Sequence, residues 1–598
     1  MRRTAERRSR EGPGLWVGVA ISLLVSALAV ALAVYSASVR ADPSATPSRP
    51  PPPPALDAAA QLAVRNQTEL IAREDERLLA LLRAVPHRAA AYVDRSSGTP
   101  AAVLTLRPRP YDVDDLVRLG AARRPAPDVI ELVMPVLVAP GARLEVHAPG
   151  SVLRMTSTPA RFTSLVAWKA AVTLSGEPGR PLAVTSWDAP AGGADILTED
   201  GRAYLRAVGA QMRIESAAVS ALGFWSGRTG GIAFTGSDDD PATGAVVDTT
   251  ISGCHYGLFS SDTRDLRIER VAVADAVADG MLFYRGTVGA QVHDGSVRSS
   301  GADGLATARG TSSITVNRLS SEGNAQNGIA VDGRPLATKP GPSGASMEGG
   351  SGFRITDSTS RRNGRVGILV RDADDSTVTG NEVDGNTEGV VVRGPARSVV
   401  IRGNVVTHSR GTAIGVRDGA TDVVVTRNVI GGATTGVQVR NSRAIVSGNR
   451  AEGLAAHGVS VQGVSGGSAV LRNLLVGRGP SAVDLYRLQA GATVAMAGNG
   501  TDNWENYRTF QQRVRDTIRD HPLLPLWVVL LAVPAVATIF ARSRRRGGVR
   551  LPYRVVPSVA EISVAGSESA RSNGAADNAS GTRLTLLATG WPRSGRAR

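Results

Sequence analysis

The chain has 598 residues, a formal net charge of +15 and a single cysteine, Cys254. One cysteine excludes an intramolecular disulfide and any cysteine-based metal cluster. Only Lys169 and Lys339 are lysines, so the positive charge is almost entirely arginine, and local charge is more informative than the total. A chain of this length can hold several domains or one long solenoid that grows by stacking repeats.

Residues 1–41 combine a basic start with a long apolar run. Arginines crowd the first ten residues, and Leu15 to Val39 carries no charge. The run is longer than the roughly 20 residues that cross a hydrocarbon core, and its basic flank should stay in the cytoplasm. We expect a cytoplasmic tail and a transmembrane anchor, with cleavage as a signal peptide near Val39-Arg40-Ala41 as the alternative.

Residues 42–100 are expected to form a linker and a helical stalk. Prolines crowd residues 42–54, which predicts a stiff extended spacer. From Leu56 to Leu82 apolar residues recur at helical spacing, and the pattern stops before Pro86. This helix could be a stalk or a cap on the segment that follows.

Residues 101–500 contain a repeated phrase: a small residue, an aliphatic, any residue, an aliphatic and usually a polar residue. Gly389-Val390-Val391-Val392-Arg393 is one copy. Neighbouring copies are 22 to 26 residues apart, except for one interval of 39 residues. A period this constant predicts a solenoid in which every repeat adds one turn. The first aliphatics are Ile232, Leu258, Met281, Leu305, Ile329, Ile368, Val390, Ile414, Val437, Val459 and Val483.

Side-chain alternation within the phrase predicts how the turns stack. Val390 and Val392 should face one way and Val391 the other, so stacked turns bury the first set as aliphatic columns. A second strand follows about ten residues later and ends in asparagine, as in Val425-Thr426-Arg427-Asn428, which could form an amide ladder. The fold class is therefore all-β, a parallel β-helix that is right-handed by the usual crossover rule. The long interval holds Pro335 to Gly350, a surface loop that could overhang a groove.

The C-terminal segments predict a second membrane crossing. Residues 501–522 form an amphipathic linker, and residues 523–541 are apolar, with Arg542 and further arginines directly after them. Residues 542–598 are polar and poor in aromatics, as in a disordered cytoplasmic tail. The expected protein is a two-pass cell-membrane protein with both termini in the cytoplasm and the solenoid outside.

The repeat also predicts a row of charge on the solvent side. Four arginines occupy the same position of consecutive copies, so their α-carbons should lie about 4.8 Å apart. An anionic polymer bound along the row would relieve their repulsion, and a chain of uronic acids repeats on a comparable length. The alternative is that Asp372, Asp418 and solvent neutralise the row. The four arginines are Arg371, Arg393, Arg417 and Arg440.

Other polar residues give weaker signals. The histidines lie on different turns without metal-ligand spacing, and His255 is retained as a candidate polysaccharide contact. The acidic stretches at Asp238 to Asp240 and Asp372 to Asp375 could bind calcium, but turns at strand ends explain them as well. The sequence has no phosphate loop, no Ser-His-Asp spacing and no zinc motif. We therefore assign no metal site and no cofactor, and expect no nucleic-acid partner.

Between Val129 and Val392 the sequence resembles the periplasmic mannuronan C5-epimerases that act on alginate, relatives of the carbohydrate-acting, pectate-lyase-like β-helix proteins. Short sequence segments carry the resemblance, for example Pro135-Val136-Leu137-Val138-Ala139-Pro140-Gly141-Ala142 and Tyr256-Gly257-Leu258-Phe259. The resemblance implies their fold. The family's Asp-Pro-His-Asp segment falls here on Leu282-Phe283-Tyr284-Arg285, so the catalytic tetrapeptide is not retained. The family's arginine that neutralises the sugar carboxylate matches Arg309.

C5 epimerisation needs a cation for the carboxylate, a base and an acid. The resemblance makes Arg309 the cation, and puts Tyr284 in the place of the family's histidine, where Arg285 or Arg309 would have to stabilise its phenolate. We expect a membrane-anchored extracytoplasmic β-helix that binds an anionic cell-surface polysaccharide during its assembly, export or modification. A polymer synthase or export machinery would then be a further partner. The alternatives are an active C5-epimerase or lyase using Tyr284, Arg285 and Arg309, and a structural or adhesive scaffold.

Overall fold

The computed structural model describes residues 58–85, 90–96, 99–159, 161–339 and 346–507, and four isolated positions between 521 and 534. The described residues between 58 and 521 belong to one compact unit. The apolar segments 15–39 and 523–541 lie outside the described residues, apart from three isolated positions of the second. No helix in the described part of the chain has the length and apolar character needed to cross a bilayer.

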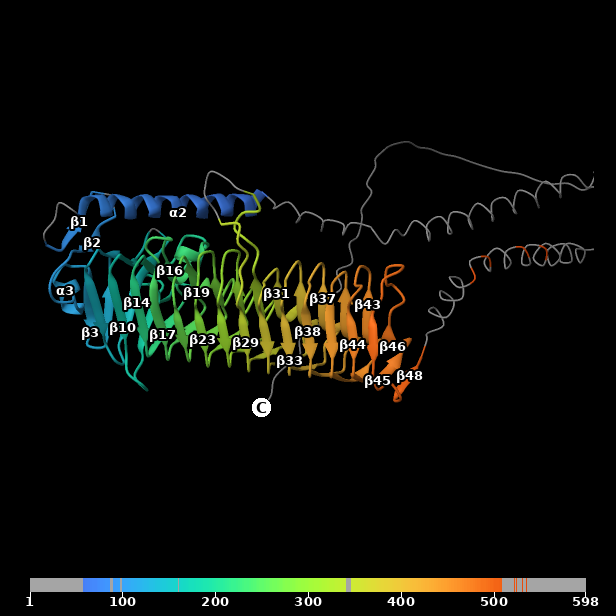
Figure 1. Ribbon diagram of the computed structural model, residues 1–598. Helices are drawn as coiled ribbons and strands as arrows, with labels where there is room; N and C mark the ends of the chain where they lie inside the picture. The colour runs from blue at the N-terminus through green and yellow to red at the C-terminus, as the bar shows by residue number, and fades with distance from the viewer. Residues whose placement is uncertain are drawn as a thin grey trace, which may run out of the picture. The chain divides into compact units, whose positions relative to one another are not determined.

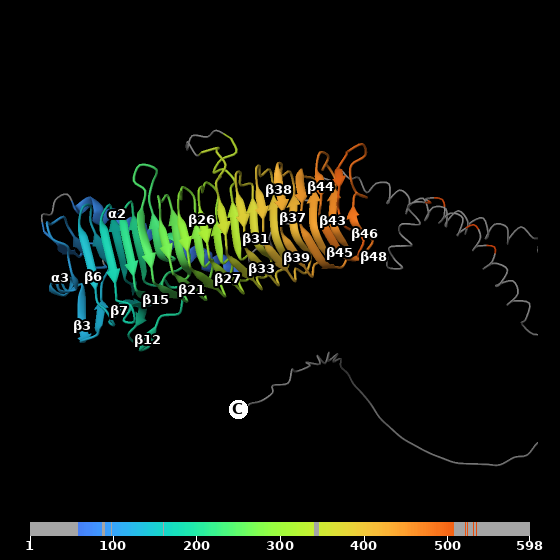
Figure 2. The same ribbon diagram turned by 60° about the horizontal axis from the view of Figure 1, so that its bottom comes forward.

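The chain winds into a solenoid with three long sheets, which we call sheets A, B and C (Figures 1 and 2). One turn runs from β31 (Val366–Arg371) in sheet A through β32 (Thr377–Thr379) in sheet B and β33 (Glu382–Asp384) in sheet C to β34 (Glu388–Arg393), again in sheet A. Strands of successive turns pair in parallel. The predicted parallel β-helix is confirmed.

Sheet A has sixteen strands, in which only β1 and β2 pair antiparallel. In spatial order they are β1 (Tyr92–Asp94), β2 (Ala101–Leu104), β5 (Val136–Val138), β9 (Ser164–Trp168), β13 (Tyr204–Val208), β16 (Gly231–Thr235), β19 (Tyr256–Ser261), β22 (Met281–Phe283), β25 (Leu305–Thr307), β28 (Ile329–Asp332), β31, β34, β37 (Thr412–Arg417), β40 (Thr435–Arg440), β43 (His457–Gln462) and β46 (Ser481–Asp484).

Sheet B has fourteen strands. In chain order they are β6 (Arg143–His147), β10 (Ala171–Ser175), β14 (Gln211–Glu215), β17 (Thr243–Val247), β20 (Arg267–Glu269), β23 (Gln291–His293), β26 (Thr315–Asn317), β29 (Arg354–Thr356), β32, β35 (Val400–Arg402), β38 (Val423–Thr426), β41 (Ala444–Ser447), β44 (Ala469–Leu471) and β47 (Ala495–Ala497).

Sheet C has eighteen strands, and the first of them belong to the N-terminal turns of the solenoid. They are β3 (Ala122–Ala126), β4 (Val129–Leu132), β7 (Val152–Thr158), β8 (Arg161–Phe162), β11 (Leu182–Asp188), β12 (Gly193–Ala194), β15 (Ala217–Ser220), β18 (Thr250–Ser252), β21 (Ala272–Ala274), β24 (Ser296–Arg298), β27 (Ser320–Glu322), β30 (Thr359–Arg361), β33, β36 (Val405–Thr407), β39 (Val429–Gly431), β42 (Arg450–Leu454), β45 (Leu474–Gly479) and β48 (Trp504–Asn506).

Aliphatic columns fill the interior. Ile368 pairs with Val390 and Val390 with Ile414, and each is fully buried. The second aliphatic of each phrase forms a parallel column, with Val392 next to Val416. Burying one such side chain contributes about 1.5–3 kcal/mol, so the stacked columns stabilise the solenoid along its whole length. The expected burial pattern is confirmed.

Asparagines form a ladder between sheets B and C. The Asn404 Nδ2 donates to Asn428 Oδ1 over 3.0 Å, and the Asn428 Nδ2 donates to Asn449 Oδ1 over 2.9 Å. Each Oδ1 also accepts the backbone N–H of the asparagine one turn earlier, as Asn428 Oδ1 does from Asn404. The ladder thus satisfies buried polar groups at the bend, as the repeated asparagine predicts.

In the described part of the chain, three helical segments accompany the solenoid: α2 (Ala58–Ala84), α3 (Val113–Arg118) and the 3-10 turn η2 (Gly227–Thr229). The α2 helix lies along the outside of sheet A and follows the solenoid axis (Figure 1). Its Ile71, Leu78 and Leu81 are buried there. The helix expected between Leu56 and Leu82 therefore packs along the side of the solenoid.

Candidate functional site

The outward side chains of sheet A form three columns, which we call the sheet A face. The middle column continues through almost every turn, and its neighbours are fixed by the strand pairing. It is flanked by an upstream column at the start of the strands, which includes Asp279, Asp303 and Glu388, and by a downstream column at their ends, which includes the row from Arg371 to Arg440. The middle column runs Arg206, Ala233, Phe259, Leu282, Ala306, Ala330, Leu369, Val391, Gly415, Gln438, Ser460 and Asp484.

Helix α2 covers the first strands of this face. Its apolar side packs on outward side chains of β2, β5, β9 and β13, among them Val103, Leu137, Val166 and Tyr204. An ion pair between Asp75 and Arg228 also joins α2 to η2. Among the described ion pairs of α2, it involves the partner that is farthest along the chain. From β22 on, exposed side chains such as Tyr284 lie at the strand ends, while Ala306, Ala330 and Val391 of the middle column stay buried. The first part of the sheet A face is thus an internal packing surface.

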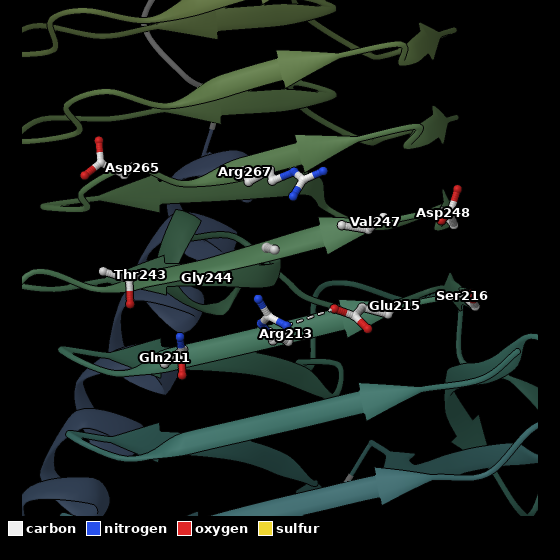
Figure 3. Close-up of a pocket in the computed structure, with 11 residues that line it drawn as sticks. Gln211, Arg213, Glu215, Ser216, Thr243, Gly244, Val247, Asp248, Asp265 and Arg267 are labelled. Carbon is white, nitrogen blue, oxygen red and sulfur yellow. Dashed lines mark hydrogen bonds and ion pairs between the residues drawn. The ribbon is translucent and has the colours of Figure 1, made fainter.

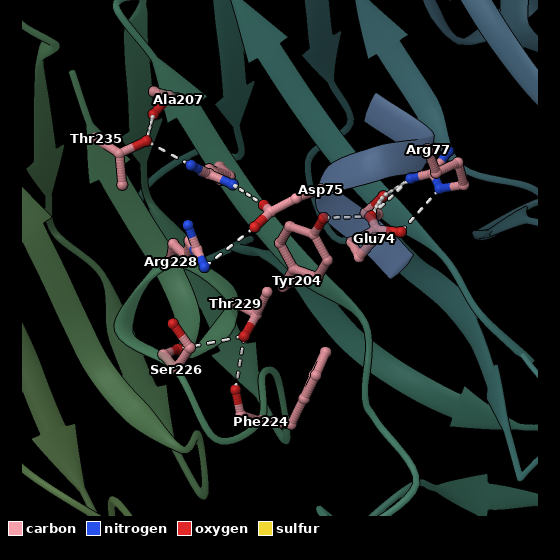
Figure 4. Close-up of polar contacts among 12 residues, drawn as sticks. Glu74, Asp75, Arg77, Tyr204, Ala207, Phe224, Ser226, Arg228, Thr229 and Thr235 are labelled. Carbon is pink, nitrogen blue, oxygen red and sulfur yellow. Dashed lines mark hydrogen bonds and ion pairs between the residues drawn. The ribbon is translucent and has the colours of Figure 1, made fainter. Parts of the chain in front are cut away.

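Buried polar contacts fix α2 in place (Figure 4). The Glu74 carboxylate accepts two hydrogen bonds from Arg77, of 2.6 and 2.8 Å, and one from the hydroxyl of Tyr204. Burial, and then the Glu74 charge, raise the pKa of Tyr204 well above its ordinary value, so the phenol stays a donor. Asp75 in turn lies 3.7 Å from the buried Arg206 guanidinium. These contacts specify one docked position of the helix.

Three aromatic rings form a row where the face becomes exposed. The ring centroids of Tyr256 and Phe259 are 6.0 Å apart, and those of Phe259 and Tyr284 are 5.9 Å apart. Tyr284 is 44% exposed, whereas Phe259 is buried. Burial, with smaller effects of Asp279 and Tyr284, raises the pKa of Tyr256 to about 12. The row presents apolar ring surface with hydroxyl groups at its edges, which suits a ligand that is apolar on one side and polar at its edges.

Two carboxylates lie beside the aromatic row in the upstream column, on adjacent turns. The backbone N–H of Asp303 donates to Asp279 Oδ1 over 2.9 Å, and Asn327 donates twice to Asp303 Oδ1 over 2.8 Å. Burial raises the pKa of Asp279 to about 6, and the neighbouring Asp303 charge adds to the rise. Burial also raises the pKa of Asp303. Asp279 can therefore exchange a proton close to neutral pH.

The residues predicted as a catalytic set lie on this part of the face. Phe283 is fully buried and Tyr284 points outward, as the repeat predicts. Arg285 lies 3.8 Å from Asp262, and Arg309 is exposed. Among the described residues, no hydrogen bond or ion pair joins Tyr284 to either arginine. The structure brings the three residues to one edge without the contact that a stabilised phenolate would need.

The predicted arginine row exists, and carboxylates accompany it. Arg371 pairs with Arg393, Arg393 with Arg417 and Arg417 with Arg440 in the strand register. Asp418 lies 3.5 Å from Arg393 and 3.2 Å from Arg440, while Arg371 is 4.0 Å from Asp332. Asp418 therefore neutralises two of the arginines, as the alternative reading expects. Asp372 lies instead 3.9 Å from Arg334.

Arg417 differs from the other arginines of the row. Its guanidinium donates to the two carboxylate oxygens of Glu388 over 2.6 and 3.2 Å and is 16% exposed. A β-carbon on Gly415 would lie 3.1 to 3.3 Å from the guanidinium, so the glycine leaves the room that this conformation needs. The Arg417 side chain thus folds back over Gly415 in the middle column. It separates the part of the sheet A face on the preceding strands from the part on the following strands.

His255 lies just before β19 and is partly buried. Its ring packs edge-on against Tyr256, with the centroids 5.1 Å apart, and its Nδ1 has no hydrogen-bond partner among the described residues. Burial lowers the pKa of His255 to about 4, and the Arg202 guanidinium adds to the effect. The ring is therefore neutral at physiological pH, and the structure places it behind Tyr256, where it supports the aromatic row.

The acidic stretches considered for calcium are engaged with basic side chains. Asp240 lies 2.5 Å from Lys169, and Asp374 lies 3.6 Å from Arg397. Within the described ranges, no three histidine, cysteine, aspartate or glutamate side chains gather as metal ligands would.

A shallow pocket of about 480 Å³ lies on sheet B, away from the aromatic row (Figure 3). Ala245 of β17 lies in its floor between Arg213 of β14 and Arg267 of β20, since the three residues pair in register. Arg213 lies 3.4 Å from Glu215 on its own strand, and Arg267 is hydrogen-bonded to Glu269. Both arginines are therefore already neutralised locally, and the pocket is a weaker candidate than the sheet A face.

Tyr256, Asp279 and Asp303 are not among the site residues predicted from the sequence. A signal was present, because Asp279-Gly280 and Asp303-Gly304 occupy the same position before two consecutive copies of the phrase. Extending the phrase by one residue toward the N-terminus would have placed both carboxylates in one column. Their proximity to the aromatic rings depends on side-chain packing, which the repeat does not specify.

Residues 343–501 match the family model of the right-handed β-helix region. No curated protein matches the sequence. Among solved structures the chain is similar to the periplasmic alginate epimerase AlgG, at 15% identity and a TM-score of 0.48 over 67% of this chain and 85% of that one. It is also similar to the A-module of the mannuronan C-5 epimerase AlgE6 of Azotobacter vinelandii (16%, TM-score 0.34, 62% and 91%) and to the surface adhesin PfbA of Streptococcus pneumoniae (10%, 0.35, 55% and 84%). At these identities the likeness concerns the fold alone.

Proposed function

The chain is a right-handed parallel β-helix, and we propose that it binds an acidic polysaccharide along the sheet A face. The observation that carries the proposal is the aromatic row of Tyr256, Phe259 and Tyr284 next to the carboxylates of Asp279 and Asp303. A sugar ring has apolar faces and hydroxyl edges. Its face would stack on the exposed Tyr284 ring while its hydroxyl groups donate to the two carboxylates.

The downstream column would hold the acid groups of the polymer. Arg393 is 47% exposed and has one carboxylate at 3.5 Å, and Arg371 has one at 4.0 Å. Such loosely paired arginines can exchange their partner for a sugar carboxylate at little cost. Arg417 is held by two hydrogen bonds to Glu388, so it takes less part in binding than the repeat alone implies. Strand spacing of about 4.8 Å allows roughly one sugar to lie on each turn.

A binding measurement tests this proposal. Calorimetric titration of the full chain with polymannuronate should give a Kd that rises at least about tenfold in Tyr284→Ala, because stacked and desolvated aromatic surface contributes roughly 1–2 kcal/mol. Arg393→Glu should raise the Kd further. This increase in Kd should be largest at low salt, where charges are screened least. The matched controls are Tyr507→Ala, a tyrosine that is 60% exposed outside this face, and Arg397→Glu. Equal affinities of wild type and both face variants would overturn the proposal.

Chemistry at the same place is a second candidate, because Asp279 has a pKa of about 6 beside the tyrosines. A carboxylate with this pKa can take a C5 proton from a uronate whose acid group is held by an arginine, as epimerisation or elimination requires. NMR of polymannuronate in heavy water would follow C5 proton exchange. Loss of exchange in Asp279→Asn, but not in Tyr284→Phe, would assign the base to Asp279. Loss of exchange in Tyr284→Phe would instead assign the base to Tyr284. Absence of exchange in wild type would indicate a binding protein or a scaffold.

Display outside the cell membrane is also part of the proposal. It rests on the apolar segments 15–39 and 523–541 and on their basic flanks. A solenoid held in this way would meet a polymer as a synthase or export apparatus delivers it. Protease protection of the termini in sealed vesicles, together with accessibility of the solenoid, is the measurement that checks the orientation.

A further inference from the structure

Polar side chains gather at the far end of the sheet A face, beyond Arg417, on β43 and β46. The Ser460 hydroxyl donates to Asp484 Oδ2 over 2.9 Å, and Gln462 donates to Ser460 over 2.8 Å. His457 Nδ1 lies 3.1 Å from the carbonyl oxygen of Ser481 and 3.2 Å from its hydroxyl. We call His457, Ser460, Gln462, Ser481 and Asp484 the C-terminal polar cluster.

His457 and Asp484 present two hydrogen-bond acceptors side by side. Their Nε2 and Oδ2 atoms are 3.8 Å apart, which is too long for a direct hydrogen bond. The Ser481 carbonyl oxygen can only accept, so Nδ1 carries the proton that it donates to this oxygen, and Nε2 is left as an acceptor. Two neighbouring hydroxyl groups of a sugar would then donate, one to Nε2 and one to Oδ2.

The surroundings favour a sugar ligand at these two acceptors. The side chains of His457 and Asp484 are 21% and 11% exposed, so both are held rigidly and still reach solvent. Tyr486 follows on the same strand end and is 49% exposed, and its backbone N–H donates to the other Asp484 oxygen over 3.0 Å. A carboxylate and a histidine thus lie together on the face that carries the aromatic row, and an exposed tyrosine follows two residues later in the chain.

We propose that the C-terminal polar cluster is a second sugar-binding subsite, which recognises hydroxyl groups of the polysaccharide bound along the sheet A face. This inference rests on the proposed function. Eight strand spacings of about 4.8 Å separate Tyr284 on β22 from Asp484 on β46, so the two subsites lie roughly 38 Å apart. Only a polymer long enough to span this distance engages both, and its second contact is made without a new loss of translational freedom.

Oligomer length is the variable that tests the second subsite. Titrating the full chain with mannuronate oligomers of about four and about twelve sugars compares chains shorter and longer than the roughly 38 Å span. Wild type should bind the long oligomer at least about tenfold more tightly, the effect of one further hydrogen bond to a charged group. Asp484→Asn and His457→Ala should each weaken binding of the long oligomer severalfold relative to wild type and leave only the gain that the arginine row contributes. Asp422→Asn, an exposed aspartate paired with Arg443 beside sheet B, is the control.

The outcomes separate the two proposals. If short oligomers bind and both variants keep the full gain for long ones, the second subsite is wrong and the proposed function stands. If no oligomer binds wild type, the proposed function fails, and this inference fails with it. Thermal unfolding of each variant shows whether a loss of affinity reflects misfolding, and Asp484→Asn keeps an oxygen that Ser460 can still donate to.

Discussion

Arg417 and Glu388 hold each other across the sheet A face, with two hydrogen bonds over the α-carbon of Gly415. An arginine that the repeat places in an open row is thereby withdrawn from it. The pair also divides the exposed face between the aromatic row and the C-terminal polar cluster. One ion pair thus determines which cations of the row are available to an anion.

Releasing Arg417 should strengthen binding of a polyanion. Glu388→Gln removes the charge that holds the guanidinium, so we expect a severalfold lower Kd for polymannuronate and a loss of stability of about 1 kcal/mol, because the pair is only partly buried. Calorimetric titration and urea unfolding measure the two effects. Glu382→Gln, which unpairs Arg361 on sheet C, is the control and should leave binding unchanged. Weaker binding in Glu388→Gln would contradict the prediction.

Asp279 should make the stability of the fold fall as pH rises. Its folded pKa of about 6 lies above the ordinary value of 3.8, so the folded state binds more protons between these values and stability declines as pH rises from about 4 to 6. Asp279→Asn should therefore be more stable than wild type at pH 7, by up to about 3 kcal/mol, and equal to it below pH 4. Urea unfolding at several pH values checks this, with Asp422→Asn as the exposed control. A pH-independent difference would show that charge burial is not its cause.

The asparagine ladder should be costly to interrupt. Asn428 donates to Ile401 O and Asn449 Oδ1, and its own Oδ1 accepts two bonds from Asn404, so Asn428→Ala leaves several buried groups without partners. Each such group costs about 1–3 kcal/mol, and we expect at least about 3 kcal/mol in urea unfolding. Asn317→Ala, near the surface of sheet B, should cost less than about 1 kcal/mol. Similar losses of stability at the two sites would show that stacking of the asparagines adds no further stability.

The docking of α2 should depend on the buried hydroxyl of Tyr204. Tyr204→Phe removes its hydrogen bond to Glu74 and leaves part of a buried carboxylate without a partner, a loss of roughly 1.5–3 kcal/mol. Hydrogen exchange of residues 67–81 should accelerate before that of the sheet strands. Leu79→Ala, on a position of the same helix that is 45% exposed, is the control. Unchanged exchange in Tyr204→Phe would show that the apolar contacts alone hold the helix.

The repeat by itself determined which side chains of each turn are buried and which stack. A strand has a period of two, and a solenoid turn has a fixed length, so equivalent residues of successive copies must become neighbours. This is why the columns of Ile368 and Val370, the asparagine ladder and the row from Arg371 to Arg440 follow from spacing alone.

Only the tertiary structure decided what each outward side chain touches. Arg417 bends back to Glu388 because Gly415 leaves room, and Asp279 has a raised pKa because of its burial beside Asp303. Helix α2 packs its apolar side on β2, β5, β9 and β13, which its own sequence does not reveal. Backbone pairing is set by a local, periodic pattern, whereas rotamers, burial and partners are set by neighbours that differ from turn to turn. The candidate site is therefore determined by side-chain contacts that differ between turns.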